Sequence, residues 1–381
     1  MKKWFQSDML SKLFEALLPV IATLAALLIG AVMLLILGVN PIEAYGALLD
    51  GAFGSMNALA DTAVKATPLL LVGLGICISF RGNVINIGGE GQMIVGALAA
   101  TLIGLLFPDW PGWLLVPLAL IAGFLGGAVW GGIPGALKAY FNVNEILSTI
   151  MMNAIAVQSM NFLLAGPMID PVQLSQASRI PQTARLNRAF DLPRLVPTRL
   201  HLGALIAVVL AVLVYILLWR TTLGYRIRAV GKNPHASRYA GIDVKRQIVL
   251  SLLLAGAFAG LAGAFQVYGV NHRMITDGSA TGFTGSAGFN GIVAALFGQL
   301  HPIGTIPASF LFGALLVGAN KLQRAVQVPS ALIIALNGLV VVFVVSSEIW
   351  RRKRQQRRLS DAMREEEQPL GTDAGAQEET I

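Results

Sequence analysis

The stretch LGALIAVVLAVLVYILLW, residues 202–219, contains no charged residue. The hydrocarbon core of a bilayer is about 30 Å thick, and an α-helix needs about 20 apolar residues to cross it. Other apolar blocks of this kind run along the chain, at residues 17–39, 58–80, 85–107, 113–137, 145–164, 247–270, 286–300, 303–320 and 326–349. The sequence therefore predicts an all-α polytopic membrane protein with about ten transmembrane helices, the first of them uncleaved.

Composition supports the same class. Hydrophobic residues make up 55% of the 381 residues and charged residues only 13%, whereas soluble domains carry about 25% charged residues. The net charge of +8 comes from basic residues near the ends of the apolar blocks, which indicates membrane orientation and no nucleic-acid partner. The single cysteine, Cys77, excludes an intrachain disulfide or a cysteine-cluster metal site.

Glycines recur at intervals of four in two of the apolar blocks. They occupy positions 123, 127, 131 and 135 in one block and 256 and 260 in another. Small residues let the backbones of membrane helices approach closely. We expect these two glycine series to lie at helix–helix contacts.

The distribution of lysine and arginine predicts the orientation. Ten spans place both termini on one side, and if that side is cytoplasmic it holds 19 of the 28 basic residues, as the positive-inside rule favours. Residues 1–350 then form a transmembrane domain with an irregular external loop at 165–200 and a cytoplasmic segment at 220–246. Residues 351–381 are expected to be a disordered cytoplasmic tail, whose basic start is a candidate for contact with membrane lipid.

The segment 220–246 is too long for a simple turn. It carries seven basic residues and one acidic residue, Asp243. Asn233-Pro234 marks a turn, after which one short helix, from Pro234 to Tyr239 and ending near Gly241, is predicted with glycines as hinges. Such a helix at the membrane surface could dock into a cytosolic partner. An ordinary positively charged loop is the alternative.

A second polar segment, NIGGEGQ at 86–92, interrupts an apolar block. Asn86, Glu90 and Gln92 stand among three glycines, which break helical regularity, and discontinuous membrane helices commonly line substrate paths. An ionisable residue at membrane depth is a functional candidate. These residues are therefore candidates for a substrate path or an inner gate. The alternative is a solvated helix end with Glu90 paired to Arg81.

Further polar residues lie in or near spans. Asp61 and Lys65, four residues apart, are expected to form a structural salt bridge, with a proton relay as the alternative. Asn153 and its neighbours Gln158 and Asn161 either face a solute or bond between helices. Phe289 and Asn290 are candidates for an external mouth that accepts a ring-shaped solute, with a plain loop as the alternative. Asn144 is expected to cap a helix.

Four motifs, in order along the chain, resemble the permease subunits of ABC importers for branched-chain amino acids, simple sugars and nucleosides. They are NIGGEGQ at 86–92, NEILSTIMMN at 144–153, GYRIRAVGKNPHASRYAGID at 224–243 and GFNGIVAALFGQLHPIGTIPASFLFGALL at 288–316. The wording PHASRYAGI is most similar to the sugar and nucleoside branch.

The resemblance implies a bacterial inner-membrane permease that forms the translocation path for a nucleoside or simple sugar. It also implies a cytosolic ABC ATPase that binds ATP and Mg, a second permease subunit, alike or different, and an extracytoplasmic solute-binding protein. No G-x-x-x-x-G-K-[ST] motif occurs, so ATP hydrolysis is expected in the separate ATPase. The ATPase-coupling residues would be Gly224, Arg226, Arg228, Gly231, Asn233, Pro234, Arg238, Tyr239 and Gly241.

Two alternatives stay open within transport. One is a branched-chain amino acid importer permease, and the other is a secondary transporter driven by an ion gradient. A membrane-embedded enzyme would need a converging catalytic set, and none is visible in the sequence.

Overall fold

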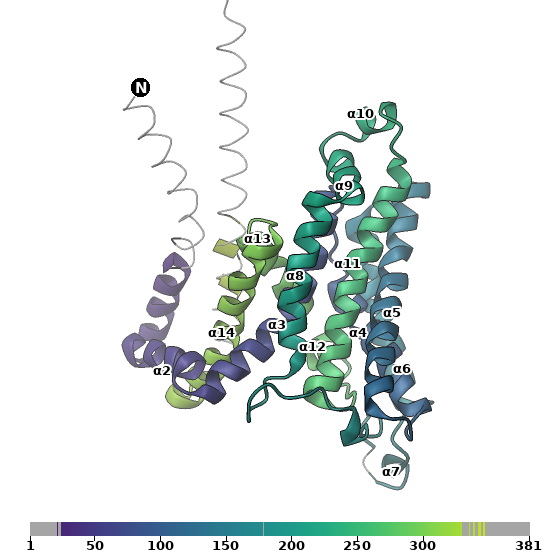
Figure 1. Cartoon of the computed structure of the whole chain (residues 1–381). Coiled ribbons are helices and arrows are strands. Elements are labelled where there is room, and N and C mark those ends of the chain that lie inside the picture. Colours follow the sequence, from purple (N-terminus) through teal and green to yellow (C-terminus); the bar gives the residue numbers. More distant parts are fainter. Residues whose placement is uncertain are drawn as a thin grey trace, which may run out of the picture.

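The computed structural model describes residue 21, residues 24–177 and 179–329, and residues 335, 338, 339, 342, 343 and 346. Within this part of the chain the protein is helical, and its two β-bridges are isolated contacts between loops (Figure 1).

Seven helices are long and apolar enough to cross a membrane, and each coincides with a predicted block. They are α3 (Met56–Arg81), α4 (Gly89–Leu106), α5 (Gly112–Phe141), α6 (Glu145–Ala165), α8 (Leu202–Arg220), α11 (Val244–Gln266) with its π-helical continuation η2 (Val267–Asn271), and α14 (Pro302–Val326).

Two shorter apolar helices match two further blocks. They are Leu24–Ile36, within the block 17–39, and α13 (Ala287–Phe297), within the block 286–300. Most of the last block, 326–349, and the whole tail, 351–381, fall outside the described residues. The count of ten spans and the cytoplasmic position of both termini therefore stay predictions.

The remaining helices are short or lie between spans. The helix α2 (Pro41–Phe53), which we did not predict, starts with Asn40 as its cap and proline as its first residue. The others are α7 (Pro171–Leu174), the 3₁₀ turn η1 (Arg188–Phe190), α9 (Thr222–Lys232), α10 (Pro234–Tyr239) and α12 (Ala280–Thr284).

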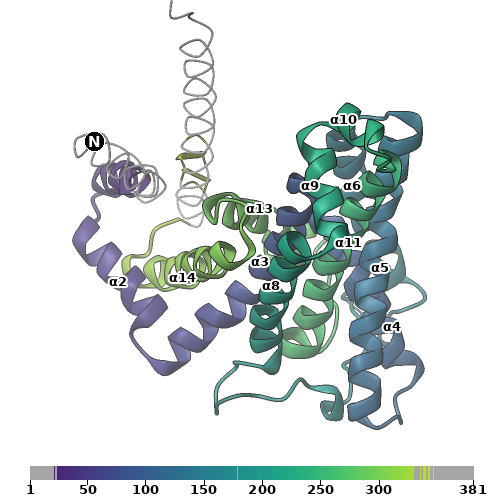
Figure 2. The ribbon, with the colours of Figure 1, turned by 45° about the horizontal axis from the view of Figure 1, so that its top comes forward.

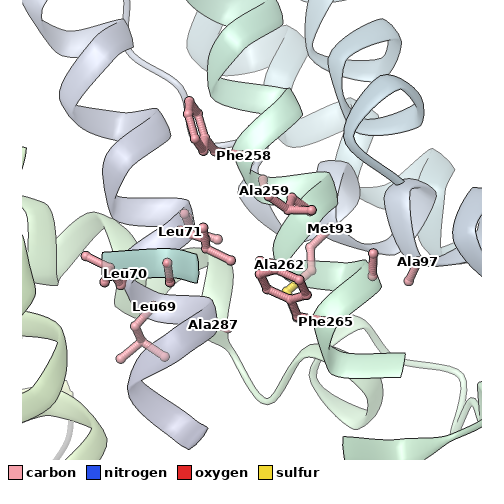
Figure 3. Packing of buried hydrophobic residues seen from close by; sticks show 14 of the residues in the cluster. Leu69, Leu70, Leu71, Met93, Ala97, Phe258, Ala259, Ala262, Phe265 and Ala287 are labelled. Carbon is pink, nitrogen blue, oxygen red and sulfur yellow. The ribbon is translucent and has the colours of Figure 1, made fainter. Parts of the chain in front are cut away.

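The long helices form two neighbouring groups. α11 packs against α5, α4 and α3, while α14 packs against α3 and α2, so α3 belongs to both groups (Figures 1 and 2). Figure 3 shows buried side chains of α3, α4 and α11 meeting in the core, with Ala287 of α13 beside them. α9 and α10 lie at one end of the helices and α7 at the opposite end (Figure 1).

The glycine series predicted for helix contacts meet each other between α5 and α11. A Cβ atom on Gly127 would lie 2.3 Å from the Gly256 carbonyl oxygen, and one on Gly260 would lie 2.3 Å from the Gly123 carbonyl oxygen. Side chains larger than hydrogen do not fit at such separations. The prediction that these glycines lie at a helix–helix contact is confirmed.

Candidate functional site

The segment 220–246 contains two helices rather than one. The predicted helix from Pro234 to Tyr239 is present as α10, capped by the Asn233 side chain, which accepts a hydrogen bond from the Ala236 amide at 3.0 Å. The preceding residues form the unpredicted helix α9, capped by Thr221. The expectation of glycine hinges is wrong for Gly224 and Gly231, which lie inside α9.

These glycines instead allow close packing at the end of the bundle. A Cβ atom on Gly224 would lie 2.0 Å from the Leu217 carbonyl oxygen in α8, and one on Gly231 would lie 2.0 Å from the Arg81 carbonyl oxygen in α3. Gly241 differs, because its φ of +76° ends α10 in a left-handed conformation that glycine adopts without strain. α9 is therefore seated directly on the ends of two spans.

The opposite face of this segment is open. Arg226 on α9 and Asn233, Pro234, Arg238 and Tyr239 around α10 are all exposed, and Tyr239 is 95% exposed. An aromatic ring left this exposed, among arginines, is available to a partner surface.

A cluster of aromatic and basic side chains, Arg81, Tyr215, Trp219, Arg228 and His301, joins α9 to three other elements. The guanidinium carbons of Arg81 and Arg228 lie 5.2 Å and 5.8 Å from the centre of the Trp219 ring. The His301 ring, just before α14, lies 5.0 Å from the same ring. Such contacts are worth about 0.5–2 kcal/mol each. We call this set the Trp219 cluster; sequence reasoning missed it because its members are far apart in the chain.

The Trp219 cluster also reaches the turn between α13 and α14. The Arg81 side chain donates two hydrogen bonds to the Leu300 carbonyl oxygen, each 3.3 Å long. Leu300 follows α13 in a left-handed conformation. The end of α13 is thus attached to the same group of side chains as α9.

The polar side chains of NIGGEGQ largely satisfy one another. Asn86 and Gln92 exchange two amide hydrogen bonds, at 3.0 Å and 3.1 Å, and both are buried. Asn153 of α6 accepts from the Gly91 amide at 2.8 Å and donates to the Ile87 carbonyl at 2.9 Å. These contacts favour the bonding interpretation of Asn153, in which its amide pairs α6 with the irregular start of α4.

Glu90 is buried inside the bundle, with 1% of its surface exposed. Its Oε1 atom accepts a hydrogen bond of 3.2 Å from the Phe289 amide in the first turn of α13. The Gly288 backbone lies so close that a Cβ atom there would be 2.5 Å from the Glu90 nitrogen. A helix start stabilises negative charge, so α13 holds the Glu90 carboxylate by its amide end.

This contact bears on two expectations. The alternative of a solvated helix end is wrong, because Glu90 is buried. The backbone of Phe289 meets Glu90 while its ring is 48% exposed, and its place at an external mouth stays a prediction. Asn290, the next residue, lies in the first turn of α13 and is partly exposed.

Two expectations about helix starts have opposite outcomes. The Asn144 side chain caps α6 as predicted, accepting from the Ile146 amide at 2.9 Å. The predicted salt bridge between Asp61 and Lys65 is wrong, because their charged atoms are not within 4.0 Å of each other.

The long loop 165–200 is irregular, as predicted, and it is fixed to the segment 268–276. The Thr183 amide donates to the Met274 carbonyl at 2.9 Å, and the Leu192 amide donates to the Tyr268 carbonyl at 3.1 Å. The Nδ1 atom of His272 lies 2.7 Å from the Oδ1 atom of Asp191. Two segments distant in sequence thus form one surface at the end opposite α10.

Within the described part of the chain, no three side chains of His, Cys, Asp or Glu come together as metal ligands would. The polar side chains of NIGGEGQ and Asn153 bond to one another and to backbone atoms.

Comparison with known proteins identifies the family. Residues 58–345 match the family described as "Branched-chain amino acid transport system / permease component". The chain is 38% identical to the guanosine ABC transporter permease of Bacillus subtilis, over 89% of this chain and 95% of the relative. It is 34% identical to the glucose ABC transporter permease of Haloferax volcanii, over 88% of each chain.

A third relative is the nucleoside ABC transporter permease of Lactococcus lactis. It is 32% identical, over 88% of this chain and 92% of the relative. No solved structure matches. The chain belongs to the family of branched-chain amino acid transport system permease components, which includes these ABC transporter permeases.

Proposed function

We propose that this chain is the permease subunit of a bacterial ABC importer for a nucleoside or a simple sugar. The observation that carries the proposal is its 38% identity, over almost the full length of both chains, to a permease named for guanosine. The relatives named for glucose and for nucleosides support the same two solute classes. No described residue set suggests ion coupling within this chain, and membership in an ABC permease family favours ATP as the energy source.

In this proposal α10 is the contact point for a cytosolic ATPase. Its exposed residues, with Tyr239 foremost, would sit in a groove of that partner, and the ATP and Mg would be bound there. α9 would pass movement of the ATPase to the bundle, because Gly231 rests on α3 and Arg228 rests on Trp219. The Trp219 cluster would carry the same movement to α13 through Arg81 and Leu300.

Glu90 and the start of α13 would form the gate. Movement of the Leu300 end of α13 would displace its other end, where the Phe289 amide donates a hydrogen bond to the Glu90 carboxylate. Opening this contact would connect the two sides of the bundle at the irregular start of α4. Asn86, Gln92 and Asn153 would hold that irregular segment in place while the gate moves.

Two further partners follow from this assignment. A second permease subunit, identical or different, would complete the path, and Bacillus subtilis provides a second guanosine ABC transporter permease that is 30% identical to this chain. The surface formed by 165–200 and 271–286 would receive an extracytoplasmic solute-binding protein.

The solute assignment is tested by uptake in cells that lack other importers for these solutes. The permease is expressed with its genomic neighbours, and accumulation of radiolabelled guanosine, glucose and leucine is compared with and without a functional ATPase. Uptake of guanosine or glucose that depends on the ATPase is expected. Uptake of leucine alone, or uptake abolished by an ionophore but not by ATPase loss, would replace the proposal with one of the alternatives.

The coupling assignment is tested by exchanging residues 231–239 for a flexible linker of equal length. We expect ATP-driven uptake to fall to background while the permease still inserts into the membrane, because the remaining spans are untouched. Copurification of the ATPase should be lost at the same time. Normal uptake in this variant would remove α10 from the mechanism.

A further inference from the structure

A cavity of about 190 Å³ lies between α3, the end of α11, the α12–α13 connection and α14. Four polar side chains line it, from different elements: Lys65, Gln266, Thr284 and Asn320. Apolar side chains, including Pro68 and Leu316, form the rest of its wall. A mostly apolar wall with a few convergent polar groups is the usual composition of a small-molecule site.

The charge of Lys65 determines what fills this space. Lys65 is the tenth residue of α3, so it lies about 14 Å along the helix from its start. α3, with 26 residues, is about 39 Å long and exceeds the hydrocarbon core of about 30 Å. Lys65 therefore lies inside the span, yet its side chain is exposed. A lysine at that depth faces protein or water rather than lipid.

The ammonium group of Lys65 is not used by the fold. No carboxylate of the described residues lies within 4.0 Å of it, and none of their acceptors bonds to it. Lys138 and Lys321 differ, because each pairs with an acidic side chain, Glu145 and Asp50 respectively. A cation at membrane depth that makes no ion pair or hydrogen bond with the described residues remains available to a ligand.

The cavity is next to the Glu90 gate. Thr284 lines the cavity, and as the last residue of α12 it lies at the α12–α13 connection that leads to the residues in contact with Glu90. Ala287, the first residue of α13, lines it too, two residues before the amide that bonds to Glu90. Gln266, the last residue of α11, places the cavity towards the segment 268–276, on the side of the loop 165–200.

We propose that this cavity holds the transported solute beside the Glu90–Phe289 contact, with Lys65 donating hydrogen bonds to its oxygen or ring-nitrogen acceptors. The proposal rests on the proposed function and narrows its solute class. The side-chain amides of Gln266 and Asn320 suit a neutral solute with hydroxyl groups or a heteroaromatic ring. Among the residues lining the cavity there is no carboxylate to bind an ammonium group, so nucleosides and sugars fit better than amino acids.

The test measures how uptake depends on solute concentration in the complete transporter. The wild type is assayed first, to establish which of guanosine or glucose it imports; failure at that step would overturn the proposed function without addressing the cavity. Lys65→Gln is then expected to raise KM about tenfold, the factor that the loss of one charge-assisted hydrogen bond produces. The maximal rate and the copurification of partner subunits should stay unchanged.

Three further measurements make the result specific. Asn320→Ala should also raise KM, because Asn320 lines the same cavity. Lys321→Gln, at the adjacent position but paired with Asp50 and outside the cavity, is the matched control and should leave KM unchanged. A nucleoside bearing a primary amine should inhibit uptake more strongly in Lys65→Gln than in the wild type, because the repelling charge is gone.

The outcomes separate a solute site from other roles. An unchanged KM in both Lys65→Gln and Asn320→Ala overturns the proposal. Loss of the second permease subunit from the purified complex, with KM unchanged in the remaining intact complexes, would assign this face to the subunit interface. A fall in maximal rate alone would assign Lys65 to the movement of the helices.

Discussion

The two oxygen atoms of the Glu90 carboxylate have different environments. Oε1 accepts the Phe289 amide hydrogen bond, while Oε2 is buried and has no hydrogen-bond partner among the described residues. Burying a charged group is costly unless it is hydrogen-bonded. The contact between the starts of α4 and α13 is therefore easier to separate than one in which both carboxylate oxygens are hydrogen-bonded.

Replacing Glu90 by glutamine should slow transport without dissociating the complex. The glutamine oxygen can still accept from the Phe289 amide, but a neutral bond is worth about 1 kcal/mol less than a charged one, which corresponds to about fivefold. We expect the maximal uptake rate, measured with radiolabelled solute, to fall by about this factor, because the weaker contact re-forms the closed state less readily in each transport cycle. Glu145→Gln, which only breaks the contact with Lys138 at a helix end, should change the rate less than twofold. Equal rates in both variants would return Glu90 to a structural role.

A second residue-scale prediction concerns acid stability. His201 caps α8 with Nδ1, which accepts from the Gly203 amide at 3.2 Å, and its ring is buried against Gly269. Burial and, to a lesser extent, the neighbouring His272 lower the pKa of His201 from 6.5 to about 4. The unfolded chain therefore takes up this proton first, and stability present above pH 6.5 is lost as the pH falls towards 4.

Acidification from pH 7.5 to 5 should cost about 2 kcal/mol at this histidine alone. The asparagine variant His201→Asn keeps a capping oxygen but does not titrate, so it should lose that much less stability over the same interval. Unfolding in detergent micelles at both pH values measures the difference. His235→Asn, a change at an exposed position on α10, serves as the control and should behave like the wild type. Identical acid sensitivity in His201→Asn would contradict the assignment.

The residue types of NIGGEGQ indicate that its polar side chains need hydrogen-bond partners. They do not indicate which residues those partners are. Amides and a carboxylate within an apolar block must find partners, so their participation in a network could be expected from sequence. The partners themselves, Phe289 for Glu90 and the backbone around Gly91 for Asn153, come from distant segments. From the sequence alone, the nearby Arg81 and solvent were the candidate partners of Glu90. Both were wrong.

At the scale of elements, the local sequence predicted where helices begin and which glycines lie at helix contacts better than it predicted which helices pack together. Asn233-Pro234 correctly marked the start of α10, and the glycine series correctly indicated a helix contact. α9 was missed because the glycines of the segment 220–246 were interpreted as hinges, although glycine in a helix equally permits close packing. Choosing between these interpretations requires knowing that α3 and α8 end beneath α9.

The contact between α5 and α11 offers a matched pair of glycines. A Cβ atom at Gly131 would lie 2.5 Å from the Leu252 carbonyl oxygen, whereas the nearest atom to one at Gly132 is 3.9 Å away. Gly131→Ala should therefore destabilise the protein by about 1–3 kcal/mol, since overpacking forces the helices apart. Gly132→Ala should be neutral or slightly stabilising. Thermal unfolding in detergent compares them, and equal melting temperatures would show that this contact is looser than described.

For the whole molecule, hydropathy predicted most spans because backbone groups in lipid must be satisfied within helices. Hydropathy did not predict α2, because the polar residues of this helix interrupt its apolar residues. Nor did it show that α13 is too short to cross the membrane. It also could not pair the loop 165–200 with 268–276, since those contacts are mostly between backbone atoms. Orientation stays a prediction from the distribution of basic residues.

The single cysteine makes that orientation easy to test. In a Cys77→Ala background, a cysteine is introduced either by Ser175→Cys, beside α7, or by Tyr239→Cys, in α10; both positions are exposed. A membrane-impermeant maleimide applied to intact spheroplasts should label the first variant and should label the second only after permeabilisation. The reverse pattern would place α10 outside the cell and would invalidate the coupling assignment.

The contact of bare backbones between α5 and α11 limits how the protein can move. At the glycine positions the backbones touch without side chains between them, so these two helices cannot slide or tilt against each other there without collision, and we expect them to move as one unit. α10 ends at Tyr239 and α11 begins at Val244, so under the proposed coupling a pull on α10 would displace both helices together. The bending that transport requires must then occur where longer side chains separate the helices, and Lys65, Leu316 and Asn320 mark such a place.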